Sequence, residues 1–562
     1  MGLPERLGRA WKHSAGFSRA AAYTASVLVA APFLYHIRHG SGAYLGLLED
    51  DHFYYTAVAD NLLEIGKSSY DGTTLTNGYH PLWFGAITAL RALCGSLGPA
   101  FYQVLALVFV ASMCVTFELG RRFARSLGAS PALSAALAAV YAVGTGRLLA
   151  SGMESALAVP LLLWWLVELA RPAQITPRRA AWLGFIASLA ILARLDLAIA
   201  VVLTIAGYVL LVRPPWPLLR RQLAGFALGG VLVPLYVAAN TAVFGTPIPV
   251  SALAKRLTLS PGFSISYARA VALGTSLGPT IAIVLPLGLA ALYRLWRRNP
   301  TERPAAYFAG GVALGFAFLF FFLNALTGWI FFGWYAYPLP AAALAAMVFI
   351  CQVGREIAPS IAARRVAVTL LSILVVAAPL GGLRYYVQHG PRWSIADNSL
   401  LAMSYELSAR LHDRQGLFAM GAVAGVAAYV SDKRVLQLEG IITDRRLVES
   451  VRRERPLQEV LEEYHADYLI VSLVGVPARR NGGCYLLMQP DEEWAGKRTA
   501  KMRGEICAEP IEHFFTEPGT HSWSVFPRVE TFVWDLRGAR WGSGAPDTVR
   551  TDPARPTRQR AT

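Results

Sequence analysis

The chain has 562 residues, of which 55% are hydrophobic and only 16% are charged, and its formal net charge is +16. In soluble domains about a quarter of the residues are charged, so this composition excludes a single soluble globular enzyme. The many large apolar residues exclude a disordered chain. Five cysteines are too few for a disulfide-dense secreted scaffold. The basic excess leaves three explanations: a nucleic-acid partner, anionic lipid or membrane topology.

Long apolar runs separated by short polar loops occupy residues 1–383. A helix that crosses a bilayer needs about 20 mostly apolar residues. The apolar stretch 81–95 is shorter and contains Arg91, so we expect it to form a helix at the membrane surface. The remaining runs predict eleven spans, at 20–36, 99–119, 130–149, 155–170, 180–195, 197–212, 223–243, 270–293, 305–326, 334–353 and 366–383.

The basic residues of the loops predict the orientation of the chain in the membrane. With these spans, 20 of the 28 Lys and Arg residues before position 384 lie at the N-terminus and in alternate loops, and 8 lie in the other loops. The positive-inside rule therefore predicts a cytoplasmic N-terminus, an uncleaved first span, and an outer loop at 37–98 in a multi-pass plasma-membrane protein. The tail from 384 onward carries 24 basic and 23 acidic residues, which argues against a nucleic-acid partner.

The first outer loop opens with three consecutive carboxylates, Glu49, Asp50 and Asp51. Neighbouring carboxylates repel one another, which raises the pKa of at least one of them unless a cation or hydrogen bonds compensate. A carboxylate of this kind at a membrane surface is suited to accept a proton from an alcohol. The alternative is that these residues are the solvated end of a span.

A second polar segment of the same loop, residues 76–83, is predicted to be a turn followed by a helix that starts at Pro81. Its side chains Asn77, Tyr79 and His80 can hydrogen-bond a sugar or phosphate beside an aromatic surface. The alternative is an aromatic belt at the membrane interface.

The strings EDDHFYY (49–55) and TNGYHPLW (76–83), together with the span layout, resemble the GT-C superfamily of polytopic glycosyltransferases, near the bacterial arabinofuranosyl- and mannosyltransferases of the cell envelope. This resemblance implies a GT-C-like bundle of about eleven transmembrane helices. It implies that a sugar passes with inversion from a polyprenyl-phosphate donor to a glycan, lipid or protein acceptor at the outer membrane face. A loop carboxylate would be the general base, with Asp50 preferred, although the sequence does not separate it from Asp51. A divalent cation, Mg²⁺ or Ca²⁺, is optional.

Cations on the outer side break the positive-inside pattern, and a lipid-linked phosphate would explain them. Arg194 and the pair Lys255 and Arg256 are such residues. The alternative is that Arg194 pairs with Asp196, and that Lys255 and Arg256 meet lipid headgroups. Glu154 and Tyr335 are also expected at outer helix ends, where each is either a ligand for the sugar or an ordinary terminal residue.

Residues 384–540 alternate strand and helix signals and predict an extracytoplasmic α/β domain with a parallel sheet, followed by a disordered tail at 541–562. Strands are expected at 417–421, 435–438 and 467–473, and helices at 423–430 and 457–465. The glycine-rich stretch 420–425 lacks a full nucleotide-binding spacing and is interpreted as close helix–strand packing. Cys484 and Cys507 can form a disulfide in an oxidising compartment.

Two other functional classes remain open. A transporter or flippase for a lipid-linked glycan would be expected to bury ionisable residues in the middle of its spans and to show internal repeats, whereas here they cluster at outer helix ends. A non-catalytic envelope scaffold would not need the acidic motif.

Overall fold

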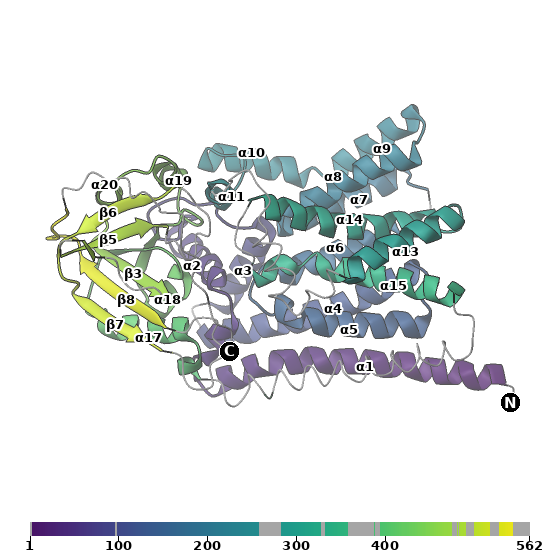
Figure 1. Cartoon of the computed structure of the whole chain (residues 1–562), viewed down its shortest axis with the longest axis horizontal. Helices are drawn as coiled ribbons and strands as arrows, with labels where there is room; N and C mark the ends of the chain where they lie inside the picture. Colours follow the sequence, from purple (N-terminus) through teal and green to yellow (C-terminus); the bar gives the residue numbers. More distant parts are fainter. Residues whose placement is uncertain are drawn as a thin grey trace, which may run out of the picture.

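The computed structural model describes residues 3–95, 98–172, 174–257, 283–327, 332–357, 387, 394–474, 480–481, 483–490, 500–517 and 528–542. It is an α-helical bundle joined at one end to a C-terminal α/β domain, and the N-terminus lies at the opposite end of the bundle (Figure 1). Two short helices of the first loop, α2 (Asp50–Ile65) and α3 (Pro81–Cys94), lie where the bundle meets this domain. The expected membrane-protein architecture with a C-terminal α/β domain is therefore confirmed.

The bundle follows the predicted apolar runs. Within the described residues, five helices are long and apolar enough to cross a membrane, and α9 with α10 is a sixth if this bent pair is one span. The expected span at 366–383, and the part of 270–293 that precedes residue 283, lie outside the described residues. The helices are α1 (Leu3–Arg38), α4 (Gly98–Ser126), α5 (Pro131–Leu149), α6 (Ser155–Leu169), α7 (Pro177–Ala193), α8 (Ala198–Gly207), α9 (Trp216–Gly229), α10 (Leu232–Phe244), α13 (Leu285–Arg298), α14 (Pro304–Thr327) and α15 (Leu339–Ile357).

The span expected at 223–243 corresponds to the end of α9 together with α10. The chain bends by 51° between α9 and α10. Gly229 and Gly230 stand at the break, and a pair of residues without side chains is a common cause of a sharp kink.

Short elements adjoin several of these helices. The 3-10 turns η1 (Ala43–Leu47), η2 (Leu195–Leu197) and η5 (Gly333–Ala336) precede α2, α8 and α15, and a π-helical turn η3 (Tyr208–Val212) extends α8. Helix α11 (Val250–Arg256) follows α10 and packs against α19 of the α/β domain.

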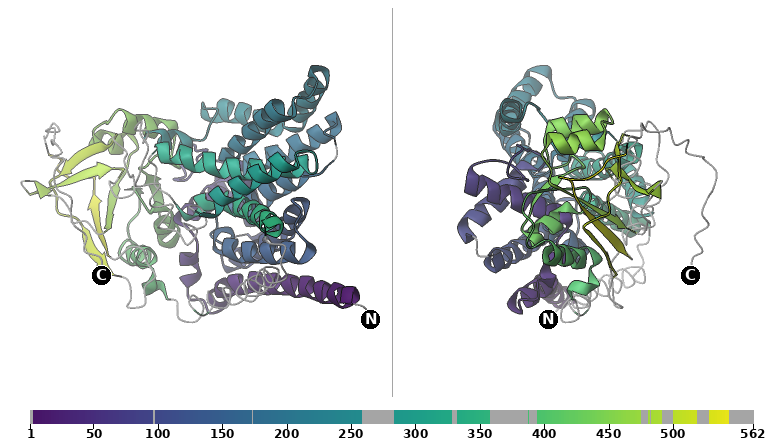
Figure 2. Two further views of the ribbon diagram at one scale, coloured as in Figure 1. Left: turned by 45° about the vertical axis from the view of Figure 1, so that its right-hand side comes forward. Right: turned by 90° about the vertical axis from the view of Figure 1, so that its left-hand side faces the viewer.

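The α/β domain contains a five-stranded sheet in the order β2-β1-β3-β8-β7 and a three-stranded sheet in the order β4-β5-β6. Figure 2 shows that these sheets lie at the end of the molecule away from the N-terminus. The elements are η6 (Ile395–Asp397), α17 (Ser399–Arg410), β1 (Leu417–Met420), α18 (Ala424–Ser431), β2 (Arg434–Gln437), α19 (Arg445–Arg452), α20 (Leu457–Glu463), β3 (Tyr468–Val474), β4 (Arg480–Asn481), β5 (Cys484–Gln489), β6 (Met502–Ile506), β7 (Glu512–Thr516) and β8 (Val529–Asp535).

The prediction of a parallel sheet holds for two of the four strand pairs in the five-stranded sheet. Strands β1, β2 and β3 pair in parallel, with Phe418 opposite both Val435 and Tyr468. Strands β7 and β8 add antiparallel pairs, with Leu469 of β3 opposite Trp534 of β8. The β–α alternation that indicates parallel strands ends at β3, and the following strands come without intervening helices, so they pair antiparallel. The predicted disordered tail lies outside the described residues from position 543 onward.

Candidate functional site

Asp50, the preferred base, anchors the α/β domain. Its carboxylate accepts hydrogen bonds from the backbone N–H groups of Gly425 (3.2 Å) and Val426 (2.7 Å) at the N-terminus of α18. A Cβ atom on Gly425 would lie 2.3 Å from the backbone oxygen of Asp50, so only glycine permits this approach. Burial raises the pKa of Asp50, and the hydrogen bonds from Val426, Gly425 and Tyr54 oppose that rise. The glycine-rich stretch 420–425 thus binds a carboxylate of the same chain. The contact lies at the N-terminus of a helix, the end that favours negative charge.

Asp51 has a different environment from Asp50. It is half-buried, as Asp50 is. Burial raises its pKa to about 8, the nearby charge of Lys255 opposes that rise, and the negative charges of Asp50, Glu154 and Glu439 add to it. Of the two candidate bases, Asp50 uses both carboxylate oxygens to hold α18, whereas Asp51 has a pKa near neutrality, which suits general-base catalysis.

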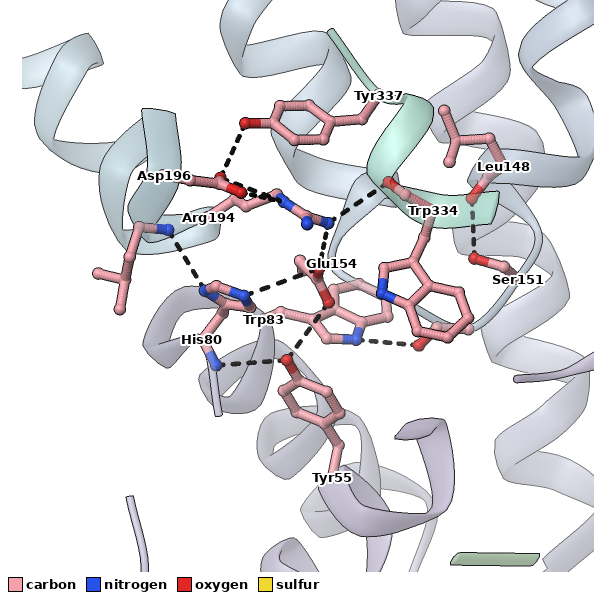
Figure 3. A network of polar contacts seen from close by, with 12 residues as sticks. Tyr55, His80, Trp83, Leu148, Ser151, Glu154, Arg194, Asp196, Trp334 and Tyr337 are labelled. Atoms are coloured by element: carbon pink, nitrogen blue, oxygen red, sulfur yellow. Dashed lines mark hydrogen bonds and ion pairs between the residues drawn. The ribbon is translucent and has the colours of Figure 1, made fainter. Parts of the chain in front are cut away.

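A buried ion-pair network surrounds Glu154 and Arg194 (Figure 3). Arg194 Nη1 donates to Glu154 Oε1 at 2.6 Å and to the backbone oxygen of Trp334 at 3.4 Å, and Arg194 Nε donates to Asp196 Oδ2 at 3.1 Å. The hydroxyl of Tyr337 donates to Asp196 Oδ1 at 2.8 Å. The guanidinium lies over the rings of Tyr335 and Tyr337. Arg194 therefore does pair with Asp196, and it also pairs with Glu154 from a position that is only 2% exposed.

His80 and Tyr55 connect the first loop to this network. The hydroxyl of Tyr55 donates to Glu154 Oε2 at 3.3 Å and accepts from the backbone N–H of His80 at 3.3 Å. Burial and the charge of Arg194 lower the pKa of His80 to about 3, so the ring is neutral. Its Nδ1 accepts from the N–H of Leu195 at 3.3 Å, which places the proton on Nε2, 3.8 Å from Glu154 Oε1. His80 thus presents a neutral N–H to the carboxylate.

Glu154 is positioned by the turn that precedes it. Gly152, at φ 81°, turns its carbonyl to accept from Trp83 Nε1 at 3.0 Å and from His52 Nδ1 at 2.9 Å. A Cβ atom there would lie 2.8 Å from the imidazole of His52. Burial lowers the pKa of His52 to about 4, so the buried ring is neutral. Two first-loop side chains thereby fix the loop that carries Glu154.

Lys255 and Arg256 are neighbours on α11 but occupy different environments. Lys255 Nζ lies 5.4 Å from the centre of the Tyr335 ring and is half-buried, whereas Arg256 is exposed. Burial alone would lower the pKa of Lys255, but Tyr335 and Asp51 raise it above its usual value, so the amine is charged. Lys255 is therefore the cation placed beside Asp51.

Asn77 and Tyr79 lie at the edge of the site and stabilise neighbouring segments. Asn77 Oδ1 accepts from the backbone N–H of Val250 at 2.9 Å and so caps α11, the helix that carries Lys255. The hydroxyl of Tyr79 pairs with Ser68 Oγ at 2.7 Å, and its ring stacks on Phe84. Neither side chain contacts Glu154 or Asp51 within the described residues.

The α/β domain contributes Glu439, on the loop after β2. Gln437 Nε2 donates to Glu439 Oε2 at 3.0 Å and thereby orients the half-buried carboxylate. The same loop presses on the first-loop turn, because a Cβ atom on Gly78 would lie 2.0 Å from the backbone oxygen of Ile441. The domain thus brings a carboxylate of its own toward Asp51, at the carboxyl end of a parallel strand, where α/β sheets commonly bind ligands.

Cys484 and Cys507 are joined in a disulfide, as the sequence predicts. Within the described residues, no group of three or more His, Cys, Asp or Glu side chains gathers as a metal site would require.

Several residues of the site are missing from the sequence-based prediction: His52, Tyr55, Trp83, Tyr337 and Glu439. Tyr55 follows Asp51 by four positions, a spacing that puts both on one face of α2, and this signal was available in the sequence. The other four reach the site through contacts between distant segments, which no local pattern records.

No family model matches the chain, and no curated protein matches it. Solved structures resemble it at low sequence identity. ArnT from Cupriavidus metallidurans bound to undecaprenyl phosphate is 12% identical, with a TM-score of 0.49 over 92% of this chain and 97% of that one. The oligosaccharyltransferase AglB from Archaeoglobus fulgidus, in complex with an inhibitory peptide and a dolichol-phosphate, is 12% identical, with a TM-score of 0.47 over 76% of this chain and 66% of that one.

The chain thus spans about two thirds of the length of the archaeal enzyme.

Proposed function

We propose that this chain is an inverting glycosyltransferase that moves a sugar from a polyprenyl-phosphate donor to a hydroxyl group of a glycan, lipid or protein acceptor, at the outer face of the plasma membrane. The observation that carries this proposal is Asp51, a half-buried carboxyl group with a pKa of about 8 beside the charged amine of Lys255. Asp51 belongs to α2 and Lys255 to α11, two helices that lie where the helical bundle meets the α/β domain (Figure 1).

In the proposed reaction, Asp51 accepts the proton of the acceptor hydroxyl as its oxygen attacks the anomeric carbon. The bond between that carbon and the polyprenyl phosphate breaks on the opposite side, which inverts the configuration. The phosphate leaves as an anion and needs no acid, and the positive charge of Lys255 stabilises the charge that develops on it. Asp50 is assigned a different role, because its carboxylate is used by α18.

The buried network supplies rigidity and sugar-binding groups. Arg194 compensates the charge of Glu154, which is only 1% exposed. The Nε2–H of His80, on a side chain that is 25% exposed, is a donor that a sugar hydroxyl can accept from. Glu439 faces Asp51 from the α/β domain and is assigned to the acceptor side.

The proposal is tested by release of free polyprenyl phosphate from a panel of labelled polyprenyl-phosphate sugars, with the full chain in nanodiscs and membrane glycolipids as acceptors. Wild type is expected to release the carrier from one donor, and Asp51→Asn to lose at least 100-fold in rate. Arg256→Gln, on the exposed neighbour of Lys255, is the matched control and should remain active.

Equal release by wild type and Asp51→Asn would remove Asp51 from the role of base. Movement of the labelled donor across the bilayer without release would favour the transporter over the transferase.

A further inference from the structure

Two side chains of the network around Glu154 and Arg194 remain open to solvent. The side chains of Glu154 and Arg194 themselves are 2% and 3% exposed. Those of His80 and Asp196 are 25% and 28% exposed. A ligand can therefore touch the network at His80 and Asp196 without displacing its buried members.

His80 and Asp196 lie close together on the same side of the network (Figure 3). The backbone N–H of Leu195, the residue before Asp196, donates to His80 Nδ1 at 3.3 Å. Burial and the charge of Arg194 lower the pKa of His80, and the negative charge of Asp196 opposes that fall, as expected for neighbouring side chains. One small ligand can therefore contact both.

The two side chains have complementary hydrogen-bonding roles. The proton of the neutral His80 ring is on Nε2, which lies 3.8 Å from Glu154 Oε1 and makes no hydrogen bond in the described part of the chain. Asp196 accepts from Arg194 Nε through both oxygens and from the Tyr337 hydroxyl through Oδ1. Since a carboxylate has about four acceptor positions, Oδ2 retains a free one. The pair thus offers one N–H donor and one carboxylate acceptor.

This pair lies near the cation that is proposed to stabilise the phosphate of the donor. The charge of Lys255 contributes to the lowered pKa of His80, after burial and the charge of Arg194. In a polyprenyl-phosphate sugar, the anomeric carbon is bonded to the phosphate, so the ring hydroxyls lie close to it. The pair is therefore placed to meet the donor sugar. An anionic ligand is disfavoured there, because Asp196 would repel it.

We propose that His80 and Asp196 bind two neighbouring hydroxyl groups of the donor sugar, so that the site selects sugars with an intact vicinal diol. One hydroxyl accepts from His80 Nε2–H, and its neighbour donates to Asp196 Oδ2. This inference rests on the proposed transferase function and names the class of sugar that it uses. A site that pairs with substrate hydroxyls rejects analogues without them, because its own polar groups then lose their partners.

The test measures binding of labelled undecaprenyl-phosphate sugars to the full chain in nanodiscs, without an acceptor. The panel holds the mannose, glucose, galactose and arabinofuranose donors, their monodeoxy analogues, and undecaprenyl phosphate alone. Wild type is expected to bind one sugar donor about tenfold more tightly than the bare carrier. Removal of either of two neighbouring hydroxyls should weaken binding about tenfold, and removal of any other should have a much smaller effect.

Two variants assign the hydroxyls to the two side chains. His80→Phe and Asp196→Ala should each abolish the discrimination at one of the two positions and keep it at the other. Asp60→Ala is the matched control, because Asp60 is also paired with an arginine and its side chain is 27% exposed. This control should keep the full pattern of discrimination.

Deoxy analogues that bind wild type as tightly as their parent donors would overturn the proposal. A pattern that is unchanged in both His80→Phe and Asp196→Ala would also overturn it, as would equal binding of the bare carrier and every sugar donor. Thermal unfolding midpoints check the folding of the variants, and the wild-type panel remains decisive if one of them unfolds. A chain that shows the expected pattern but never releases the carrier would instead contradict the transferase and leave the diol site in place.

Discussion

Asp50 and Val426 lie 376 positions apart in the chain and are joined by a hydrogen bond of 2.7 Å between the Asp50 carboxylate and the Val426 backbone N–H. This bond and its neighbour from Gly425 connect the first loop to the α/β domain. We predict that Asp50→Ala loosens that connection, at a cost on the order of 1–3 kcal/mol for the buried donors left without an acceptor.

The measurement is hydrogen–deuterium exchange of peptides from α18, which should become faster in Asp50→Ala. Asp432→Ala, at the exposed C-terminal end of the same helix, is the control and should leave the exchange of the first turn unchanged. Unchanged exchange in Asp50→Ala would contradict the anchoring role.

The pH dependence of transfer should report the carboxyl group of Asp51. Its pKa of about 8 predicts that kcat/KM rises with pH below this value, as the base loses its proton, and levels off above it. The rising part of this pH profile is its acid limb. Glu439→Gln removes a negative charge that disfavours the ionised form of Asp51, so the acid limb should move to lower pH. Lys255→Gln removes a favourable charge and should move it to higher pH, each by on the order of one unit.

Glu459→Gln, on the exposed surface of α20, is the matched control for the charge change and should not move the limb. Shifts of the same sign in Glu439→Gln and Lys255→Gln would show that a group other than Asp51 titrates in that limb.

The buried pair of Glu154 and Arg194 should behave asymmetrically on mutation. Arg194→Met leaves a carboxylate at 1% exposure without its cation, and we expect a loss of about 3–5 kcal/mol in the free energy of unfolding. Glu154→Gln combined with Arg194→Met removes the uncompensated charge and should recover much of this loss. Thermal unfolding in detergent measures both variants, and a double variant no more stable than Arg194→Met would contradict the pairing.

His52 should make stability fall in acid. Burial lowers its pKa to about 4 from a usual value of 6.5, so the unfolded chain binds the proton first. The contribution of His52 is fully present above pH 6.5 and is lost as the pH falls toward 4, by up to about 3 kcal/mol. Asp51, with a raised pKa, acts in the opposite direction, so the comparison of wild type with His52→Gln isolates the effect. A difference in unfolding free energy that stays constant between pH 7 and 4.5 would rule it out.

The bounds of strands and helices in the α/β domain could be predicted from the sequence more closely than the contacts of the first-loop carboxylates. Strand β3 was expected at 467–473 and lies at Tyr468–Val474, because a short apolar run between polar residues is a local signal. The different roles of Asp50 and Asp51 have no local signal in the sequence. They depend on contacts with α18 and Lys255, which lie about 375 and 200 positions away, and the acidic motif alone does not predict those contacts.

The cations that the charge pattern predicts for the outer side give a second example. Two of them have acidic partners within the described residues. Arg91 forms a two-pronged ion pair with Asp60, at 2.6 and 2.7 Å, and Arg194 pairs with Glu154 and Asp196. For these two residues the partners are acidic side chains of the same chain, so the charge pattern located the polar network and did not reveal what each cation binds.

The contact between Gly78 and Ile441 has a consequence for how the protein is made. The first loop is synthesised early, yet Asp50, Tyr70 and Gly78 all meet backbone groups of residues 424–442. Until ribosomes have produced those residues, the acidic motif lacks the surface against which it packs. The last segments to emerge therefore complete the site that the first segments begin, and a truncated chain that inserts normally in the membrane would still carry an unfinished site.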